Sequence, residues 1–238
     1  MRKLIISFLC VLLAFASVSC ASKKTEEENA PADTAEKVSE AITEDKQSEE
    51  LSIDSFDYSE PFDEKGCWKG INALEYVTLC DYENIDIPTD EELKAEDTNK
   101  YSYIVDYLST RCNVSSYPDL MFDYQAKALC VSIENIASSS NISYHEMLNN
   151  IGYKDSDELI EASREEINEQ IKKDLIIQAI AEEQSITMNE DLLAEYFKNS
   201  YDIEDYSSYV ERYGIGYLMY SALSEIVLKT VAGEAVFE

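Results

Sequence analysis

Apolar and polar positions along the chain change their period near residue 88. Before this point, Val77 and Leu79 alternate with polar neighbours, as do Ile85 and Ile87, which is the two-residue period of a β-strand. After it, apolar positions recur every three or four residues, which is the period of an amphipathic helix. The pattern therefore predicts a mainly α fold with one short β segment at its start.

Start signals set the beginnings of several predicted helices. Thr89 and Glu92 form a T-x-x-E capping box, so a short helix is expected there. Ser143, Asp155 and Thr187, each with a Glu three positions later, open three further helices. The predicted helices after the first cover residues 101–112, 115–139, 142–152, 155–184, 188–201, 204–214 (with Gly214 as its end) and 216–233.

The longest predicted helix, residues 155–184, has one apolar stripe with charged residues on the opposite face. The stripe consists of Leu159, Ile167, Ile171, Leu175, Ala179 and Ile180. This arrangement predicts that one face of the helix is buried.

The composition favours helices and argues against some partners. The 238 residues include only 6 glycines and 4 prolines, too few for the many tight turns of an all-β sandwich or barrel. The formal net charge of −30 disfavours nucleic acid binding, which needs clustered Lys and Arg. It also disfavours binding to an anionic membrane through protein charge.

The first twenty residues have the pattern of a targeting segment. Arg2 and Lys3 precede an apolar run over residues 4–16, which is short for a membrane span. Residues 17–20 resemble a bacterial lipobox, with Ser17 in place of the usual leucine and Cys20 as the residue to be lipidated. We expect residues 1–20 to be a lipoprotein signal peptide; the alternative is an ordinary secretory signal cleaved nearby.

Residues 21–55 follow this segment and are rich in acidic side chains. Such a stretch cannot bury enough apolar surface to order itself, so we expect a disordered acidic tether. The expected location is the bacterial cell envelope, outside the cytoplasm, with the chain anchored to the membrane through lipid on Cys20.

Four further cysteines are Cys67, Cys80, Cys112 and Cys130. In an exported protein they can be oxidised, and three pairings are possible, among which the sequence does not choose. Buried free thiols are the alternative. Because none of these cysteines has the C-x-x-C spacing of a zinc site, we expect no metal.

Signals of catalysis are weak in this sequence. His145 is the single histidine and lies in a predicted short surface helix. Acidic pairs such as residues 182–183 are expected by chance at this composition, and there is no Gly-rich phosphate loop. We expect no catalytic residue and no cofactor.

The order of these pieces resembles the trigger factor family, specifically its C-terminal, SurA-like chaperone domain. The resemblance covers roughly residues 76–238, and its strongest segments are YVTLCDYENIDI, TDEELKAE, YPDLMFDYQ, IKKDLIIQAIAEEQSITMNEDLLAEYF and YVERYGIGYLMYSALSEIVLKTV. It implies an extended helical chaperone domain with helical arms over residues 101–238. A lead-in segment with a short strand and helix would occupy residues 56–100.

In that family, a glycine-rich prolyl isomerase domain of the FKBP type follows the strand and helix. Here residues 89–100 run directly into the helical pattern that begins at Tyr101. The resemblance therefore implies an exported form that lacks the isomerase domain. The ribosome-docking domain has no counterpart either, so no docking to ribosomes is expected.

The resemblance implies binding of unfolded or newly exported polypeptides, here called clients, without ATP. Tyrosine suits this role because it joins a large apolar ring to a hydroxyl that accepts varied partners, and methionine adds a flexible contact. The candidate client-binding residues are Tyr144, Met147, Tyr201, Tyr206, Tyr209, Tyr213, Tyr217 and Tyr220. The alternative is that these side chains belong to the core. The acidic charge either favours basic clients or only keeps the chain soluble.

Two other functions remain open at this point. One is an exported foldase with residual prolyl isomerase activity. The other is a non-catalytic lipoprotein that kept the fold and binds a single specific partner.

Overall fold

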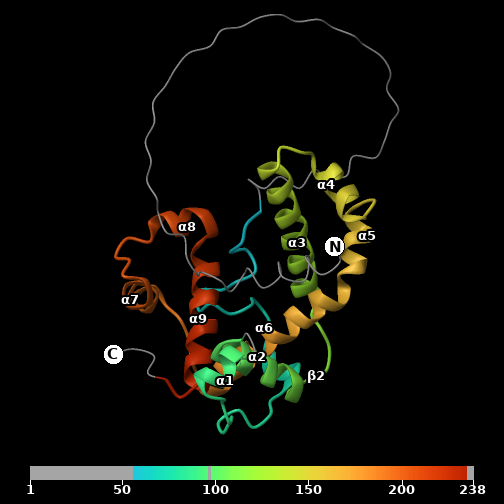
Figure 1. Cartoon of the computed structure of the whole chain (residues 1–238). Helices are drawn as coiled ribbons and strands as arrows, with labels where there is room; N and C mark the ends of the chain where they lie inside the picture. The colour runs from blue at the N-terminus through green and yellow to red at the C-terminus, as the bar shows by residue number, and fades with distance from the viewer. Residues whose placement is uncertain (1–55, 96–97, 235–238) are drawn as a thin grey trace, which may run out of the picture.

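A computed structural model describes residues 56–95 and 98–234, which form a helical body with an extension at one end (Figure 1). The predicted signal peptide, Cys20 and the predicted tether lie outside these residues. Within the described part, no helix is both long enough and apolar enough to cross a membrane. The mainly helical fold class is confirmed.

The elements follow one another in a simple order along the chain. They are the 3-10 helix η3 (Ala73–Glu75), β1 (Val77–Thr78), α1 (Asp90–Ala95), α2 (Lys100–Arg111), β2 (Asn113–Val114), α3 (Asp119–Ser139), α4 (Tyr144–Ile151), α5 (Ser156–Ala162), α6 (Arg164–Gln184), α7 (Glu190–Tyr201), α8 (Ser207–Tyr213) and α9 (Ile215–Val231).

Helix α6 is the centre of the body, and it packs against α2, α3, α5 and α9. The predicted apolar stripe is confirmed, because each of its six residues, from Leu159 in α5 to Ile180, is 0% exposed. Ile176 and Ile177 are buried as well, so α6 is covered on more than one side. Each such side chain contributes on the order of 1.5–3 kcal/mol by leaving water.

Two polar side chains of α6 hold the segment that leads into the sheet. The side-chain carbonyl of Gln178 accepts the Trp68 N–H at 2.9 Å, and its amide donates to the Ile71 carbonyl at 2.8 Å. One turn later, the Glu182 carboxylate accepts the first two N–H groups of η3 at 3.0 and 3.1 Å. These bonds satisfy backbone groups that have no partner within a helix or sheet. Glu182 thus has a structural role that its occurrence in an acidic pair did not indicate.

The loop of residues 56–68 lies against the start of α9. The Ser59 hydroxyl donates to the Tyr213 carbonyl at 3.1 Å and accepts the Tyr217 N–H at 3.0 Å. Gly214 has a φ of 73°, and a Cβ added there would collide with the Ser59 side chain. A glycine is therefore required at this turn for both its conformation and the close approach.

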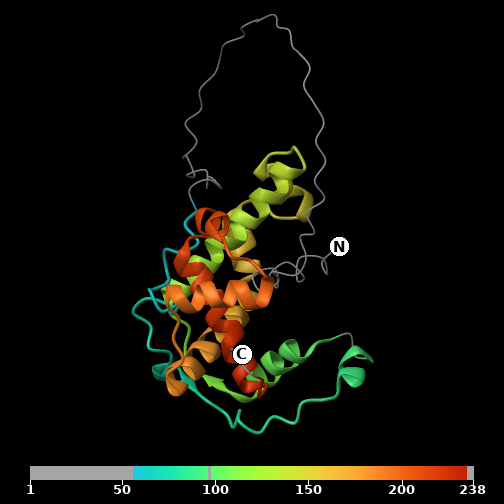
Figure 2. The same ribbon diagram turned by 90° about the vertical axis from the view of Figure 1, so that its left-hand side faces the viewer.

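A short antiparallel sheet joins the lead-in segment to the chain after α2. Val77 pairs with Val114 and Thr78 with Asn113. Between these strands the chain leaves the body, runs out to α1 and returns through α2 (Figure 2). We call residues 81–111 the α1–α2 excursion.

Three of the predicted helix caps are confirmed. Glu92 N–H donates to the Thr89 hydroxyl at 3.4 Å, while Thr89 N–H donates to the Glu92 carboxylate at 2.9 Å. The side chains of Ser143 and Asp155 each accept the N–H three residues later, at 3.1 and 3.0 Å. Each cap satisfies an N–H that the first turn of a helix leaves without a partner.

Other predicted boundaries are wrong. Asn189, not Thr187, caps α7 through its side chain. The helix predicted over residues 155–184 is broken at Ser163, where φ is −100° and ψ is 7°, and no glycine or proline marks the break. The extended piece at residues 85–87 is not a strand, because it leaves the body where no partner strand can pair with it. The short strand β2 was not predicted.

Candidate functional site

The candidate client-binding residues fall in three places of the fold. Tyr144 and Met147 lie on α4, four tyrosines lie on or beside α7 and α8, and Tyr217 and Tyr220 lie on α9. Helix α4 is at the far end of α3, separated from α7 in both views (Figures 1 and 2). The structure therefore does not bring all eight residues into one surface.

We define the inner aromatic cluster as Phe62, Trp68, Tyr124, Tyr217 and Tyr220. Phe62 stacks on Tyr220 with 4.3 Å between ring centroids and 12° between ring planes, and Trp68 meets Tyr124 edge to face at 5.4 Å. Trp68 is 1% exposed and Tyr217 is 5% exposed. These contacts are the offset and edge-on arrangements that aromatic rings prefer.

A buried carboxylate fixes the inner aromatic cluster. The Tyr220 hydroxyl donates to Asp174 at 2.7 Å, and the amides of Gln170 and Gln125 donate to the same carboxylate at 2.8 and 3.0 Å. Burial raises the pKa of Asp174 to about 6, although these three donors favour its charged form. Burial also raises the pKa of the Tyr220 hydroxyl, so it remains a donor.

This environment includes two of the candidate residues, Tyr217 and Tyr220. Tyr217 is buried in the core, whereas Tyr220 is half-buried, with its ring stacked on Phe62 and its hydroxyl bonded to Asp174. The Tyr217 ring is therefore not part of the accessible surface considered below. Contact of either ring with a client stays a prediction.

We define the outer aromatic cluster as Tyr196, Phe197, Tyr201, Tyr206 and Tyr209. Phe197 is its centre and is 4% exposed. Tyr206 stacks on Phe197 with 4.8 Å between centroids and 8° between planes, and the Tyr209 ring lies 5.5 Å from it. Tyr201, Tyr206 and Tyr209 are half-buried, so each packs one part of its ring on Phe197 or Tyr196 and leaves another part in solvent.

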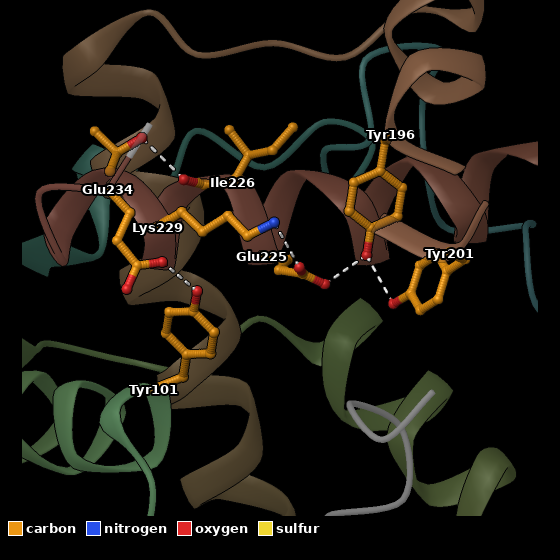
Figure 3. Close-up of polar contacts among 8 residues, drawn as sticks. Tyr101, Tyr196, Tyr201, Glu225, Ile226, Lys229 and Glu234 are labelled. Carbon is orange, nitrogen blue, oxygen red and sulfur yellow. Dashed lines mark hydrogen bonds and ion pairs between the residues drawn. The ribbon is translucent and has the colours of Figure 1, made fainter. Parts of the chain in front are cut away.

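Hydroxyl contacts anchor the outer aromatic cluster to α9 (Figure 3). The Tyr196 hydroxyl donates to the Glu225 carboxylate and lies 3.1 Å from the Tyr201 hydroxyl. Lys229 pairs with Glu225 at 2.9 Å from one turn further along the helix. Burial, followed by the hydrogen bond to Glu225, raises the pKa of Tyr196, so the hydroxyl stays protonated and holds α7 to α9.

The remaining three candidates have mixed surroundings. Tyr213 is half-buried, packs against Tyr58 with 5.6 Å between centroids, and lies 5.1 Å from the Arg212 guanidinium. Tyr144 is half-buried on α4 and its hydroxyl lies 3.0 Å from the Ser156 hydroxyl. Met147, on the same helix, is half-buried too. All three present part of their side chains to solvent.

Sequence reasoning missed the most exposed large apolar side chains among the described residues. Leu120 is 46% exposed, Leu74 is 44% exposed and Tyr117 is 37% exposed. Leu120 lies in the first turn of α3 next to Tyr117, which borders a shallow hollow formed with residues of α5 and α6. A helical projection could not have found Leu120, because it lies four residues before the buried Tyr124 and so on the same side of the helix.

Few groups in the described part suggest chemistry other than binding. No three His, Cys, Asp or Glu side chains there are placed to hold a metal ion. His145 is exposed on α4, as the sequence predicted. What the geometry offers is aromatic and apolar contact area on α7 and α8, with hydrogen-bonding hydroxyls at the ring edges.

One protein family matches the chain in comparisons with known proteins. Residues 88–213, more than half of the chain, match the family described as the bacterial trigger factor protein C-terminus. No curated protein and no solved structure matches. The matched range runs from just before α1 to the end of α8, so it includes the outer aromatic cluster and excludes α9.

Proposed function

We propose that this chain, which belongs to the trigger factor family through its C-terminal domain, is an ATP-independent chaperone that binds unfolded exported polypeptides at the cell envelope. The family supports a chaperone-like role in general terms. The kind of client, the place of action and the lipid anchor are the parts that we propose.

The observation that carries the proposal is the outer aromatic cluster. Tyr201, Tyr206 and Tyr209 are partly exposed, yet Phe197 and the Tyr196–Glu225 contact fix them from beneath. A ring that is already held in place loses little conformational freedom when it binds. Its apolar face accepts any apolar segment and its hydroxyl accepts varied polar groups, which suits a promiscuous, weak binder.

The charge of the chain supports the same role. A net charge of −30 makes copies of the protein repel one another, which opposes self-association through the partly exposed aromatic side chains. Clients with basic segments would gain attraction at longer range. Binding should then weaken as salt is raised, but only for those clients.

Support for the cellular location comes from the sequence alone. The positively charged start, the apolar run over residues 4–16 and the lipobox-like residues 17–20 support export and lipidation of Cys20. A single lipid chain gives only marginal membrane binding, so stable anchoring would need more than one acyl group on this residue.

Suppression of aggregation tests the chaperone proposal. Residues 21–238, with Cys20→Ser, would be added without nucleotide to several unrelated denatured proteins at near-equal molar ratio. We expect aggregation of most of them to fall. The double variant Tyr206→Ala/Tyr209→Ala should require at least about three times more protein for the same effect, because it removes exposed ring area while Phe197 stays in place.

The matched control is Tyr103→Ala, which removes a half-buried tyrosine from α2 instead of α8. It should suppress aggregation as the parent does, and the thermal melts of all three proteins should be compared. Failure to suppress aggregation of any client by the folded protein would contradict the proposal and favour the single-partner alternative. Faster prolyl isomerisation by the purified chain would favour the foldase alternative.

Lipidation is tested separately in a bacterial host. The full chain should incorporate a labelled fatty acid and fractionate with membranes, and Cys20→Ser should do neither. Equal labelling of both proteins would contradict anchoring through Cys20 without affecting the chaperone proposal.

A further inference from the structure

Two of the four described cysteines lie side by side at the base of the α1–α2 excursion. The Cys80 and Cys112 sulfur atoms are 3.1 Å apart, and the Cys80 N–H donates to the Cys112 sulfur at 3.3 Å. Cys67 lies in the loop before η3, and Cys130 lies inside α3, where Tyr144 and Ser156 contact its thiol. The sequence left three pairings open, and the structure brings one pair together.

The backbone on both sides holds these two cysteines in place. Cys80 follows β1 by two residues, and Cys112 directly precedes β2. The pairing of β2 with β1 fixes these two segments next to each other. Cys112 also ends α2, where its N–H donates to the Leu108 carbonyl at 2.8 Å. The approach of the sulfur atoms therefore follows from the fold of the chain and not from two free side chains that happen to meet.

We propose that Cys80 and Cys112 form a disulfide that closes the base of the α1–α2 excursion. A disulfide needs its sulfur atoms at ~2.05 Å, so the pair must close by about 1 Å, which side-chain torsions can supply. Helix α1 packs on α2 and lies away from the body (Figure 2), whereas α2 itself packs on α6 and α9. A covalent link at the base of the excursion ties both ends of residues 81–111 to the sheet.

The reaction requires a disulfide donor, which can be a protein or a small molecule with a reactive disulfide. The Cys80 thiolate attacks one donor sulfur and releases the first donor thiol. Cys112 then attacks the Cys80 sulfur of this mixed disulfide and releases the second donor thiol. The two cysteines lose two electrons and two protons, and the donor disulfide gains them.

The surroundings of the two thiols set this order of attack. Cys80 is half-buried and reachable from solvent, whereas Cys112 is 5% exposed. Burial raises the pKa of the Cys112 thiol to about 12, which slows its reaction with an external donor. Once Cys80 carries the donor, Cys112 is already in contact, so its attack is intramolecular.

Mapping of the linked peptides tests the proposal. The full 238-residue chain, solubilised in detergent, would be equilibrated in a glutathione buffer rich in the oxidised form, alkylated, digested and analysed by mass spectrometry. We expect a peptide that links Cys80 to Cys112, with Cys67 and Cys130 alkylated. A link that uses either of those two cysteines, or alkylation of all four, would overturn the proposal.

Thermal melting of the same preparations supplies a second test. Oxidation should raise the Tm of the native chain and of the control Cys67→Ser by at least about 5 °C, because the link restricts the unfolded chain. The same treatment should leave the Tm of Cys80→Ser unchanged. The proposal would also be overturned if oxidation left the Tm of the native chain unchanged. It would be overturned as well if oxidation raised the Tm of Cys80→Ser by the same amount.

Discussion

The inner and outer aromatic clusters are built from the same types of residue but differ in what covers them. In the inner aromatic cluster, the loop of residues 56–68 supplies Phe62 and Trp68, which pack on the rings of Tyr217 and Tyr220. In the outer aromatic cluster, Phe197 and Tyr196 are buried, while Tyr201, Tyr206 and Tyr209 keep one side in solvent. The inner cluster therefore stabilises the fold, and the outer cluster keeps contact area available for a partner.

The two clusters also differ in the acid that holds them. Asp174 is fully buried among three hydrogen-bond donors. Glu225 is partly exposed and pairs with Lys229 as well as with Tyr196. Losing a partner of Asp174 leaves a buried polar group unsatisfied, whereas Glu225 can turn to water. Substitutions in the inner cluster should accordingly be the more damaging.

The largest expected effect comes from Trp68→Ala in the inner aromatic cluster. The ring is 1% exposed, so its removal leaves a cavity and should lower the free energy of unfolding by about 3–5 kcal/mol. Tyr209→Ala in the outer cluster is the control and should cost about 1 kcal/mol or less. Urea unfolding followed by circular dichroism measures both. Equal losses would remove the distinction between the clusters.

The next effect is a pH dependence that belongs to the inner aromatic cluster alone. Asp174 has a pKa of about 6 in the folded chain against ~3.9 in an unfolded one, so the folded chain binds its proton more tightly. The free energy of unfolding should therefore rise as pH falls from 7 to 5, by roughly 1–2 kcal/mol from this group. Asp174→Asn should lose that part of the rise.

The measurement should be made above pH 5. Glu234, whose effect on stability changes with pH in the opposite direction, stays ionised there. The pKa of Glu234 is lowered by its bonds to Lys100 and Tyr101, so its contribution is lost only at more acidic pH. The gain from weaker charge repulsion is common to the native chain and the variant. A variant that keeps the full pH dependence would show that Asp174 is not its source.

A smaller effect is expected for Tyr196→Phe in the outer aromatic cluster. The ring and its packing on Phe197 remain, but the hydroxyl that donates to Glu225 is lost, which should cost about 1–2 kcal/mol. Tyr206→Phe keeps the ring that stacks on Phe197 and should change stability by less than about 0.5 kcal/mol. Thermal melts of the two single variants decide whether this hydroxyl anchors α7.

The smallest effect lies outside both clusters, in the α1–α2 excursion. Thr89→Ala removes the cap of α1 and should cost about 0.5–1 kcal/mol locally, while Thr89→Ser should restore the cap. Amide hydrogen exchange of residues 90–94 should speed up in the Ala variant only. If exchange in the inner aromatic cluster sped up as well, the excursion would be coupled to the core more tightly than its contacts indicate.

Local rules predicted the features that depend on neighbours in sequence. The apolar period of α6 predicted its buried stripe. The capping boxes at Thr89, Ser143 and Asp155 predicted three helix starts, because a cap and the first turn of its helix lie within four residues. The break at Ser163 has no such local mark. It arises where two helices pack on different parts of the body.

The difference between the clusters could not be predicted in the same way. Tyr217 and Tyr220 have the same spacing as Tyr206 and Tyr209, so periodicity gives the two pairs equal weight. What separates them is a loop more than 130 residues earlier in the chain. The burial of Asp174 could not be predicted either. An acidic side chain on a charged helix is expected in solvent unless its distant hydrogen-bond donors are known.

The contact of Ser59 with the start of α9 has a consequence for the order in which the chain can fold. Ser59 and Tyr217 are 158 positions apart, so the first described segment docks on α9, the last of the described helices. Until α9 has been made, Phe62 and Trp68 lack their partners Tyr217 and Tyr220 and have only the earlier contacts with α3 and α6. The family match over residues 88–213 omits both halves of this closure. The packing of residues 56–68 is therefore complete only after α9 has been made.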